Sequence, residues 1–129
     1  MKFARIIIED LEGRVLFLER NKNDYMGGKY CLPGGEIDEF ETPKAAAERE
    51  LLEETGVKAQ KTMFLYKENI PWNNMLIEKH YFKCEGSEKI TLNKESENHV
   101  WIHPGEMKKY SFAFRDDEAV EKYLAEFRD

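Results

Sequence analysis

Two patterns of hydrophobic and polar residues open the chain, and both predict strands. Residues 3–9 are rich in isoleucine, and residues 14–19 read Arg-Val-Leu-Phe-Leu-Glu. Branched and aromatic side chains favour extended backbone, so each segment is expected to form a strand. The turn residues Asp10-Leu11-Glu12-Gly13 lie between them, and this spacing predicts an antiparallel hairpin.

A polar loop and a glycine-containing turn are expected next. Residues 21–29 are polar and include two adjacent glycines. The apolar segment Tyr30-Cys31-Leu32 then stops at Pro33-Gly34-Gly35. Because glycine has no Cβ atom, this turn can bring its backbone close to a ligand.

The strongest helix signal follows this turn. Thr42 is a good N-cap, and Pro43 falls at the first helical position, where its missing N–H costs nothing. Residues 45–54 are mostly strong helix formers, and Gly56 stands where a left-handed residue after the helix is wanted. The sequence therefore predicts a helix that begins at Pro43 and ends just before Gly56.

The rest of the chain predicts further strands and a closing helix. Expected strands cover residues 63–67, 75–84 and 99–102, with a loop at 69–74. Apolar residues from about 117 to 127 follow helical spacing, and Asp116 with Asp117 is expected to cap that helix. This order predicts one α/β domain over residues 1–129, with helices covering the faces of a mixed sheet.

Composition and charge narrow the class of protein. Of 129 residues, 41% are hydrophobic and 36% are charged, which indicates a folded chain rather than a disordered one. The 20 basic and 26 acidic residues give a net charge of −6. Binding to a nucleic-acid polymer needs a basic face, so this balance argues against such a partner. An acidic protein that handles phosphates usually needs a metal cation as mediator.

The cysteines, the histidines and the N-terminus bear on location and chemistry. Cys31 and Cys84 are too few for a disulfide framework, and we expect them to be buried thiols. The N-terminus lacks the long apolar run of a signal peptide or membrane span, which favours a cytoplasmic protein without membrane attachment. His80, His99 and His103 do not share a metal-binding spacing and are expected to be strand and turn residues.

Three glutamates on the predicted helix form the principal candidate site. Glu50, Glu53 and Glu54 are three and four residues apart, so their side chains leave the same helix face. They repel one another and lie near the C-terminal end of the helix, where the helix dipole is negative. A bound cation would remove this penalty, and oxygen ligands favour Mg²⁺, Mn²⁺ or Ca²⁺. A solvated acidic helix face is the competing interpretation.

Neighbouring residues complete the pattern. Arg49 could hold a carboxylate through a bidentate pair, Glu41 could fold back onto Arg49, and the Gly35 carbonyl could face the same metal. The full spacing is Gly35, five residues, Glu41, seven residues, Arg49-Glu50-Leu51, one residue, Glu53-Glu54, one residue, Gly56-Val57. It resembles the Nudix box at every defined position, and Tyr30-Cys31-Leu32-Pro33-Gly34 resembles the lead-in of many members of that family.

The resemblance implies a fold, a reaction and a cofactor. The implied fold is the Nudix α/β/α sandwich, and the implied reaction is attack of water at phosphorus in a nucleoside diphosphate linked to another group. The implied cofactor is Mg²⁺, for which Mn²⁺ can substitute, held by Glu50, Glu53, Glu54 and the Gly35 carbonyl. Arg49 and Glu41 would orient these ligands. Members of the family are often dimers, although no residue pattern here marks a homodimer interface.

A further glutamate and the catalytic base are also implied. The segment from Glu95 to Trp101 resembles one in which family members place another metal-binding glutamate six residues before a tryptophan. Glu95 holds that position and Glu97 is the nearby alternative, while an acidic surface loop is the competing interpretation. Glu50 is the leading candidate for the general base, with Glu53 and Glu95 as alternatives.

The substrate is less well indicated. Tyr30 and Trp72 could stack on a base, and Asn74 could hydrogen-bond a base edge, although packing and loop roles are common for such residues. Pro71 lies close to the position of a proline that marks the ADP-ribose branch of the family. The leading expectation is hydrolysis of a nucleoside triphosphate, which could be an oxidised or non-standard one, to the monophosphate and pyrophosphate. The alternatives are hydrolysis of ADP-ribose or another nucleotide-sugar or dinucleotide, and a domain that senses nucleotides without catalysis.

Overall fold

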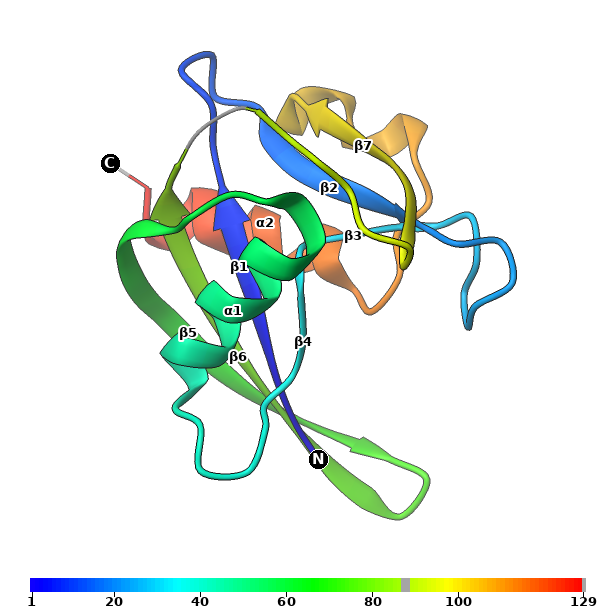
Figure 1. Cartoon of the computed structure of the whole chain (residues 1–129), viewed down its shortest axis with the longest axis vertical. Helices are drawn as coiled ribbons and strands as arrows, with labels where there is room; N and C mark the ends of the chain where they lie inside the picture. The colour runs from blue at the N-terminus through cyan, green and yellow to red at the C-terminus, as the bar shows by residue number, and fades with distance from the viewer. Residues whose placement is uncertain (87–88, 129) are drawn as a thin grey trace.

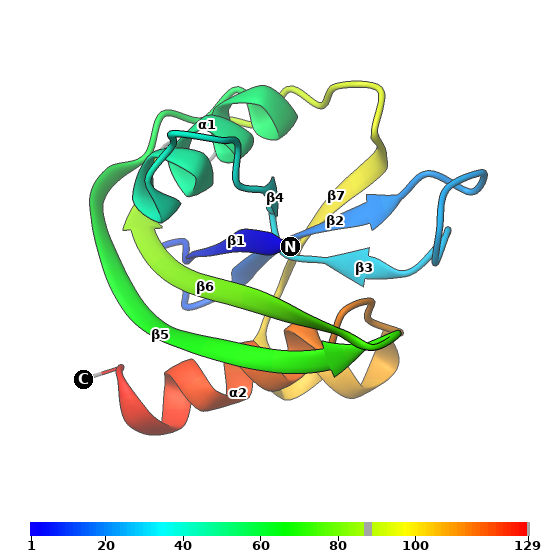
Figure 2. The ribbon, with the colours of Figure 1, turned by 90° about the horizontal axis from the view of Figure 1, so that it is seen from below.

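The first strand is apolar on both faces, and this sets the layers of the molecule. In the computed structural model, which describes residues 1–86 and 89–128, β1 (Lys2–Ile8) lies between two helices (Figure 2). Ile6 and Ile8 pack with α1 (Pro43–Thr55), whereas Ile7 packs with α2 (Asp116–Glu126) on the opposite face. A strand covered on both faces buries nearly every side chain, which explains the run of isoleucines.

The strands form two sheets (Figure 1). The larger sheet is mixed, because β1 runs parallel to β6 and antiparallel to β4. Its order is β4 (Gly34–Glu36), β1, β6 (Met75–Glu85), β5 (Gln60–Trp72). The smaller, antiparallel sheet has the order β3 (Tyr30–Cys31), β2 (Val15–Arg20), β7 (Ser96–Ile102), and the 3-10 helix η1 (Pro104–Lys109) follows it. The expected α/β class with a mixed sheet between helices is confirmed.

The predicted hairpin of the first two strands is wrong. β1 and β2 belong to different sheets, and among the described residues an isolated antiparallel bridge between Glu9, just after β1, and Val15 is all the pairing between them. Each strand pairs instead with a strand from the second half of the chain. Local alternation identifies strands but carries no information on such distant partners.

The predicted loop at residues 69–74 is also wrong, because β5 continues to Trp72. Only Asn73 and Asn74 form the turn, and both have left-handed φ angles of 49° and 61°. Asparagine tolerates this conformation better than most residues, which suits a two-residue hairpin turn. Pro71 is accommodated because β5 is an edge strand.

The helix α1 matches its prediction. The Thr42 hydroxyl accepts a hydrogen bond from the Ala45 N–H at 3.1 Å, and Pro43 is the first helical residue. Gly56 is left-handed with φ 75°, and its N–H donates to the Leu52 carbonyl at 2.9 Å. Among the described residues, no helix is long and apolar enough to cross a membrane.

The start of α2 differs from its prediction. Arg115, with φ 60°, holds the N-cap position without a side-chain cap, and Asp116 is the first helical residue. The Asp116 side chain is fully buried, and its carboxylate accepts a hydrogen bond from the Leu32 N–H at 2.9 Å. Asp116 therefore ties α2 to the segment after β3, a long-range contact that a local capping pattern does not reveal.

Gly34 lies in a short strand rather than in the predicted turn. It pairs with Arg5 of β1 and has φ 151°. A Cβ atom at this position would lie 2.1 Å from the Ala4 carbonyl oxygen, a backbone atom that cannot move aside. The sequence needs glycine here so that β4 can approach β1.

Replacing Gly34 with alanine is therefore expected to lower the free energy of unfolding by roughly 3 kcal/mol, from backbone strain and overlap together. Urea denaturation measures this loss. Gly105→Ala is the matched control, because its Cβ atom would come no closer than 3.4 Å to a neighbouring atom. Equal stability of the two variants would contradict the packing described for β4.

Candidate active site

The three glutamates of α1 occupy different environments beside β4. Glu54 is buried, with 7% of its surface exposed, and its carboxylate accepts a hydrogen bond from the Gly34 N–H at 2.8 Å. Glu50 is half-buried, and Glu53 is exposed. The carboxylates along this helix face therefore range from a buried one at Glu54 to an exposed one at Glu53.

Arg49 connects this group to the segment before the helix. Its guanidinium donates to both carboxylate oxygens of Glu41, at 2.7 and 3.0 Å. It also donates to Glu50 at 3.0 Å and to Glu53 at 3.2 Å. The Arg49 side chain thus donates hydrogen bonds to three carboxylates at once, and those to Glu41 keep the pKa of Glu41 below the ordinary range.

Burial raises the pKa of Glu54 to about 8, although the Gly34 N–H and nearby Arg5 oppose the shift. The charges of Glu50 and Glu95 raise this pKa further. Burial also raises the pKa of Glu50, partly offset by Arg49, with Glu53 and Glu95 adding repulsion. The site thus concentrates negative charge that the side chains of Arg5 and Arg49 only partly balance.

Gly35 lies directly against Glu50. A Cβ atom at Gly35 would lie 2.7 Å from the Glu50 carboxylate carbon and from one of its oxygens. The lack of a side chain at Gly35 therefore leaves room for this carboxylate beside the β4 backbone.

A cavity of about 480 Å³ adjoins the buried end of the glutamate group. Its lining brings Glu54 of α1 together with Glu95, which precedes β7. The alternative residue, Glu97, is exposed on β7 and does not line it. The lining residues are Arg20, Asp24, Tyr25, Cys31, Glu54, Glu95 and Ser96.

The donor set fits a hard divalent cation. All its side-chain donors are carboxylate oxygens, and mutual repulsion among Glu50, Glu54 and Glu95 favours a positive ion between them. Among the described residues, no three potential ligand side chains are already grouped closely enough to hold a metal. Arg49 provides a physical reason, since it holds the carboxylates of Glu50 and Glu53.

The expected base-binding residues are not gathered at this cavity. Tyr30 packs edge-to-face on Tyr110, with ring centroids 5.2 Å apart, beside the core cluster. Trp72 and Asn74 lie at the exposed tip of the β5–β6 hairpin, which projects away from α1 (Figures 1 and 2). None of the three lines the cavity next to Glu54.

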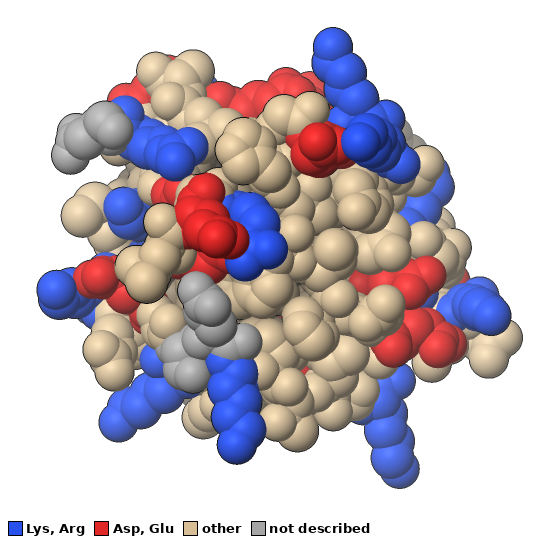
Figure 3. All heavy atoms as spheres, turned by 90° about the horizontal axis from the view of Figure 1, so that it is seen from above, with Lys and Arg blue, Asp and Glu red and all other residues tan. Residues whose placement is uncertain are grey.

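The remaining residues singled out in the sequence take structural positions. Cys31 and Cys84 are buried thiols, as expected. His80 and His99 lie in strands, and the His103 ring accepts a hydrogen bond from the Gly105 N–H, so that it caps η1. Acidic and basic side chains are interspersed over the face seen in Figure 3.

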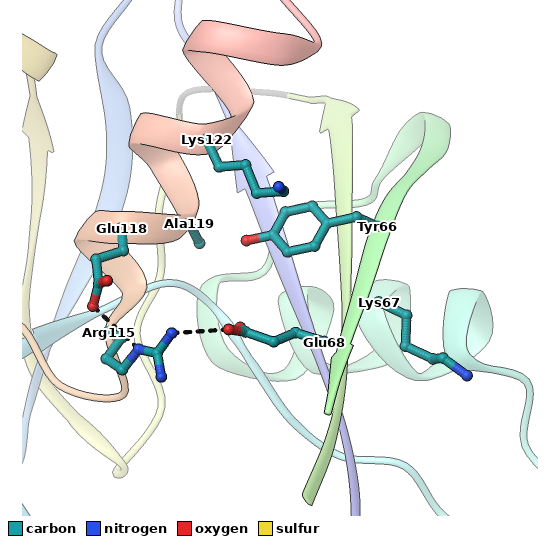
Figure 4. A pocket seen from close by; sticks show the side chains of 7 residues that line it. All are labelled: Tyr66, Lys67, Glu68, Arg115, Glu118, Ala119 and Lys122. Atoms are coloured by element: carbon teal, nitrogen blue, oxygen red, sulfur yellow. Dashed lines mark hydrogen bonds and ion pairs between the residues drawn. The ribbon is translucent and has the colours of Figure 1, made fainter. Parts of the chain in front are cut away.

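A second cavity of about 500 Å³ lies between β5 and α2, on the side of the sheet away from α1 (Figure 4). It shares no lining residue with the first cavity. Arg115 at its edge pairs with Glu68 at 2.8 Å and with Glu118 at 3.1 Å. Because this cavity is separate from the glutamate group, the first cavity is the better candidate for an active site.

The chain resembles proteins of one known family. The NUDIX domain family profile matches residues 3–123. CTP pyrophosphohydrolase from Escherichia coli (strain K12) is 24% identical over 127 residues, covering 97% of this chain and 94% of that protein. An 8-oxo-dGTP diphosphatase from Proteus vulgaris is 37% identical over 57 residues, covering 44% and 51%.

Solved structures share the fold. A MutT protein from Methanosarcina mazei Go1 has a TM-score of 0.87 at 20% identity, covering 100% of this chain and 96% of that one. The NUDIX domain of Shewanella oneidensis NrtR, crystallised with ADP ribose, has a TM-score of 0.84 at 18% identity, covering 99% and 88%.

Proposed function

Because the chain belongs to the NUDIX family and is a hydrolase of pyrophosphate bonds in nucleotide-containing substrates, we propose that it acts on a nucleoside triphosphate. The products are the monophosphate and pyrophosphate. Relatives named for CTP and for 8-oxo-dGTP, both triphosphates, support this choice. The NUDIX domain crystallised with ADP ribose supports a nucleotide-sugar as the second candidate substrate.

The observation that carries the proposal is the buried Glu54 at the wall of a cavity that also contains Glu95. A buried carboxylate whose charge is only partly offset by Arg5 gains from a divalent cation. Such a cation can in turn hold the phosphates of a substrate beside an otherwise repulsive acidic site.

The Nudix box and Glu95 supply the metal ligands in this proposal. Glu50, Glu53, Glu54 and Glu95, with the Gly35 carbonyl, would hold Mg²⁺, and Mn²⁺ can substitute. When bound there, the ion would supply charge neutralisation at the phosphates and a lowered pKa for the attacking water.

Arg49 and Glu41 position the ligand carboxylates. The bidentate pair between them fixes the guanidinium, which in turn orients Glu50 and Glu53 through single hydrogen bonds. Glu50 is the leading candidate for the general base, because partial burial raises its pKa and so strengthens its affinity for a proton. Glu53 and Glu95 are the alternatives.

A comparison of substrates tests whether the enzyme prefers nucleoside triphosphates. With Mg²⁺ present, kcat/KM is measured for CTP, dGTP, 8-oxo-dGTP and ADP-ribose. At least one triphosphate is expected to exceed ADP-ribose about tenfold or more, with pyrophosphate as the product. Preferential hydrolysis of ADP-ribose would replace the proposed substrate class but keep the reaction type.

Gly35→Ala is expected to lower kcat about 10-fold or more while changing the free energy of unfolding by less than about 1 kcal/mol. The added Cβ atom displaces the flexible Glu50 side chain rather than backbone, so the geometry of the site changes more than the fold. Steady-state kinetics and urea denaturation measure the two effects, with Gly105→Ala as control. Full activity in the Gly35 variant would show that the contact with Glu50 is not needed.

A further inference from the structure

Glu95 is held in the cavity wall by other means than the glutamates of α1. Glu50 and Glu54 are half-buried and buried on a helix that packs against the sheet, whereas Glu95 is exposed in the segment before β7. Packing of its own side chain therefore does little to fix Glu95. The path of the backbone brings this residue to the cavity that Glu54 lines, so the contacts of that backbone decide where its carboxylate lies.

The segment that carries Glu95 is first fastened to the end of α1. Residues 89–95 lead past this end of the helix into β7 (Figure 1). The Thr91 N–H donates to the carbonyl of Thr55, the last residue of α1, at 2.8 Å. The carbonyls in the last turn of a helix have no partner within the helix, so this bond satisfies one of them. It keeps the segment beside the helix that carries Glu54, but it lies four residues before Glu95.

An irregularity in the pairing of β2 with β7 lies on the other side of Glu95. The register steps over Glu97, so that Arg20 of β2 lies opposite Ser96. An extra residue in one strand re-aims the side chains around it. Asn21 then lies beside Glu95, and its N–H donates to the Glu95 carbonyl at 3.3 Å. This shift explains why Glu95 rather than Glu97 reaches the cavity.

Asn93 supplies the contact nearest to the Glu95 side chain. Its side-chain oxygen accepts a hydrogen bond from the Glu95 N–H at 3.0 Å, which closes a turn over residues 93–95. Asparagine forms such turns readily, because its side chain takes the place of a backbone carbonyl. The bond fixes the Glu95 N–H and therefore the direction in which the Glu95 side chain leaves the backbone.

We infer that Asn93 is a positioning residue for the metal site: its side chain holds the Glu95 carboxylate toward the cavity that Glu54 lines. Asn93 acts through Glu95, since its side-chain oxygen is engaged with the Glu95 N–H. This inference rests on the proposed function, because it requires Glu95 to be a ligand of the divalent cation.

Binding of Mn²⁺ in the absence of substrate tests this role, with the free ion measured by electron paramagnetic resonance. Asn93→Ala is expected to weaken Mn²⁺ binding about fivefold or more, because removing the support of a metal ligand lowers metal affinity. Asn93→Ser keeps a weaker acceptor in the same place and is expected to lose less affinity.

Asn98→Ala is the matched control. The Asn98 side-chain oxygen also accepts a hydrogen bond from a nearby backbone N–H, that of His99, at 2.8 Å, but Asn98 does not line the cavity. This variant is expected to bind Mn²⁺ as the wild type does.

A second substitution separates positioning from general damage to the fold. Glu95→Gln weakens the ligand itself, so adding Asn93→Ala to that variant should weaken Mn²⁺ binding by less than about twofold more. A purely structural role of Asn93 would instead lower the affinity by the same factor with glutamate or glutamine at position 95. Asn93→Gly, which also removes the acceptor but suits a turn, replaces the alanine variant if that variant does not fold.

Wild-type Mn²⁺ affinity without the Asn93 acceptor, or equal losses in the two backgrounds, overturns the positioning role and leaves the proposed function intact. Unchanged Mn²⁺ affinity in Glu95→Gln removes Glu95 from the proposed metal site, and the role of Asn93 falls with it.

Discussion

Glu53→Gln is expected to lower kcat about 100-fold or more while the melting temperature stays within about 2 °C of the wild type. Glutamine keeps the size of the side chain but removes the charge of a proposed metal ligand. Glu53 is exposed and contacts Arg49 only at 3.2 Å, so the fold depends little on it. Steady-state kinetics with Mg²⁺ and a thermal melt measure the two quantities.

Glu121→Gln on α2 is the matched control, because this exposed glutamate lies outside both cavities. It is expected to retain wild-type kcat. A Glu53→Gln enzyme with unchanged kcat would remove Glu53 from the metal site and from the list of candidate bases.

Stability without metal is expected to fall as the pH rises, and Glu54 is expected to cause a large part of the loss. The folded-state pKa of Glu54 is raised to about 8 from an ordinary value near 4.5. Below about pH 4.5 the carboxyl is protonated in both folded and unfolded states, so it costs nothing there. Between about pH 4.5 and 8 only the unfolded state loses the proton, which lowers the free energy of unfolding by a total on the order of 3–5 kcal/mol.

Urea denaturation with a chelator, at about pH 5 and pH 8.5, measures this loss in the wild type and in Glu54→Gln. Glutamine does not ionise, so the difference between the two proteins isolates Glu54 from other titrating groups. Mg²⁺ should restore stability at the higher pH in the wild type and much less in the variant. The same pH dependence in both proteins would show that Glu54 is not the buried acid responsible.

The sequence predicts local structure well, because local signals decide it. The helix α1 begins after Thr42 and ends before Gly56, since capping residues mark both ends. The contact between Arg49 and Glu41 was also predictable, because a short connection and the first turns of one helix join them. Such features depend on residues close in sequence.

Long-range pairing was not predictable from periodicity. β1 and β2 are each apolar on both faces, and this pattern does not show that their partners are β6 and β7 rather than each other. Asp116 looked like a helix cap, yet it is buried against the segment after β3, which lies 84 residues earlier in the sequence.

The candidate site shows the same division. Glu95 lies far from α1 in sequence. Only the family resemblance suggested that it lies near the glutamates of α1. The buried charged cluster of Arg5, Lys79 and Asp116 was missed, although one signal was present: Arg5 interrupts the apolar residues 3–8 of β1. A charge within a buried strand needs partners, and the sequence does not name them.

Pyrophosphate release from nucleoside triphosphates, assayed with Mg²⁺ and again with EDTA, tests the central claim most directly. The wild-type protein is expected to release pyrophosphate with Mg²⁺ and to lose this activity, by a factor of about 100 or more, when EDTA removes the metal. Equal pyrophosphate release under both conditions would contradict a catalytic metal site at the glutamates of α1.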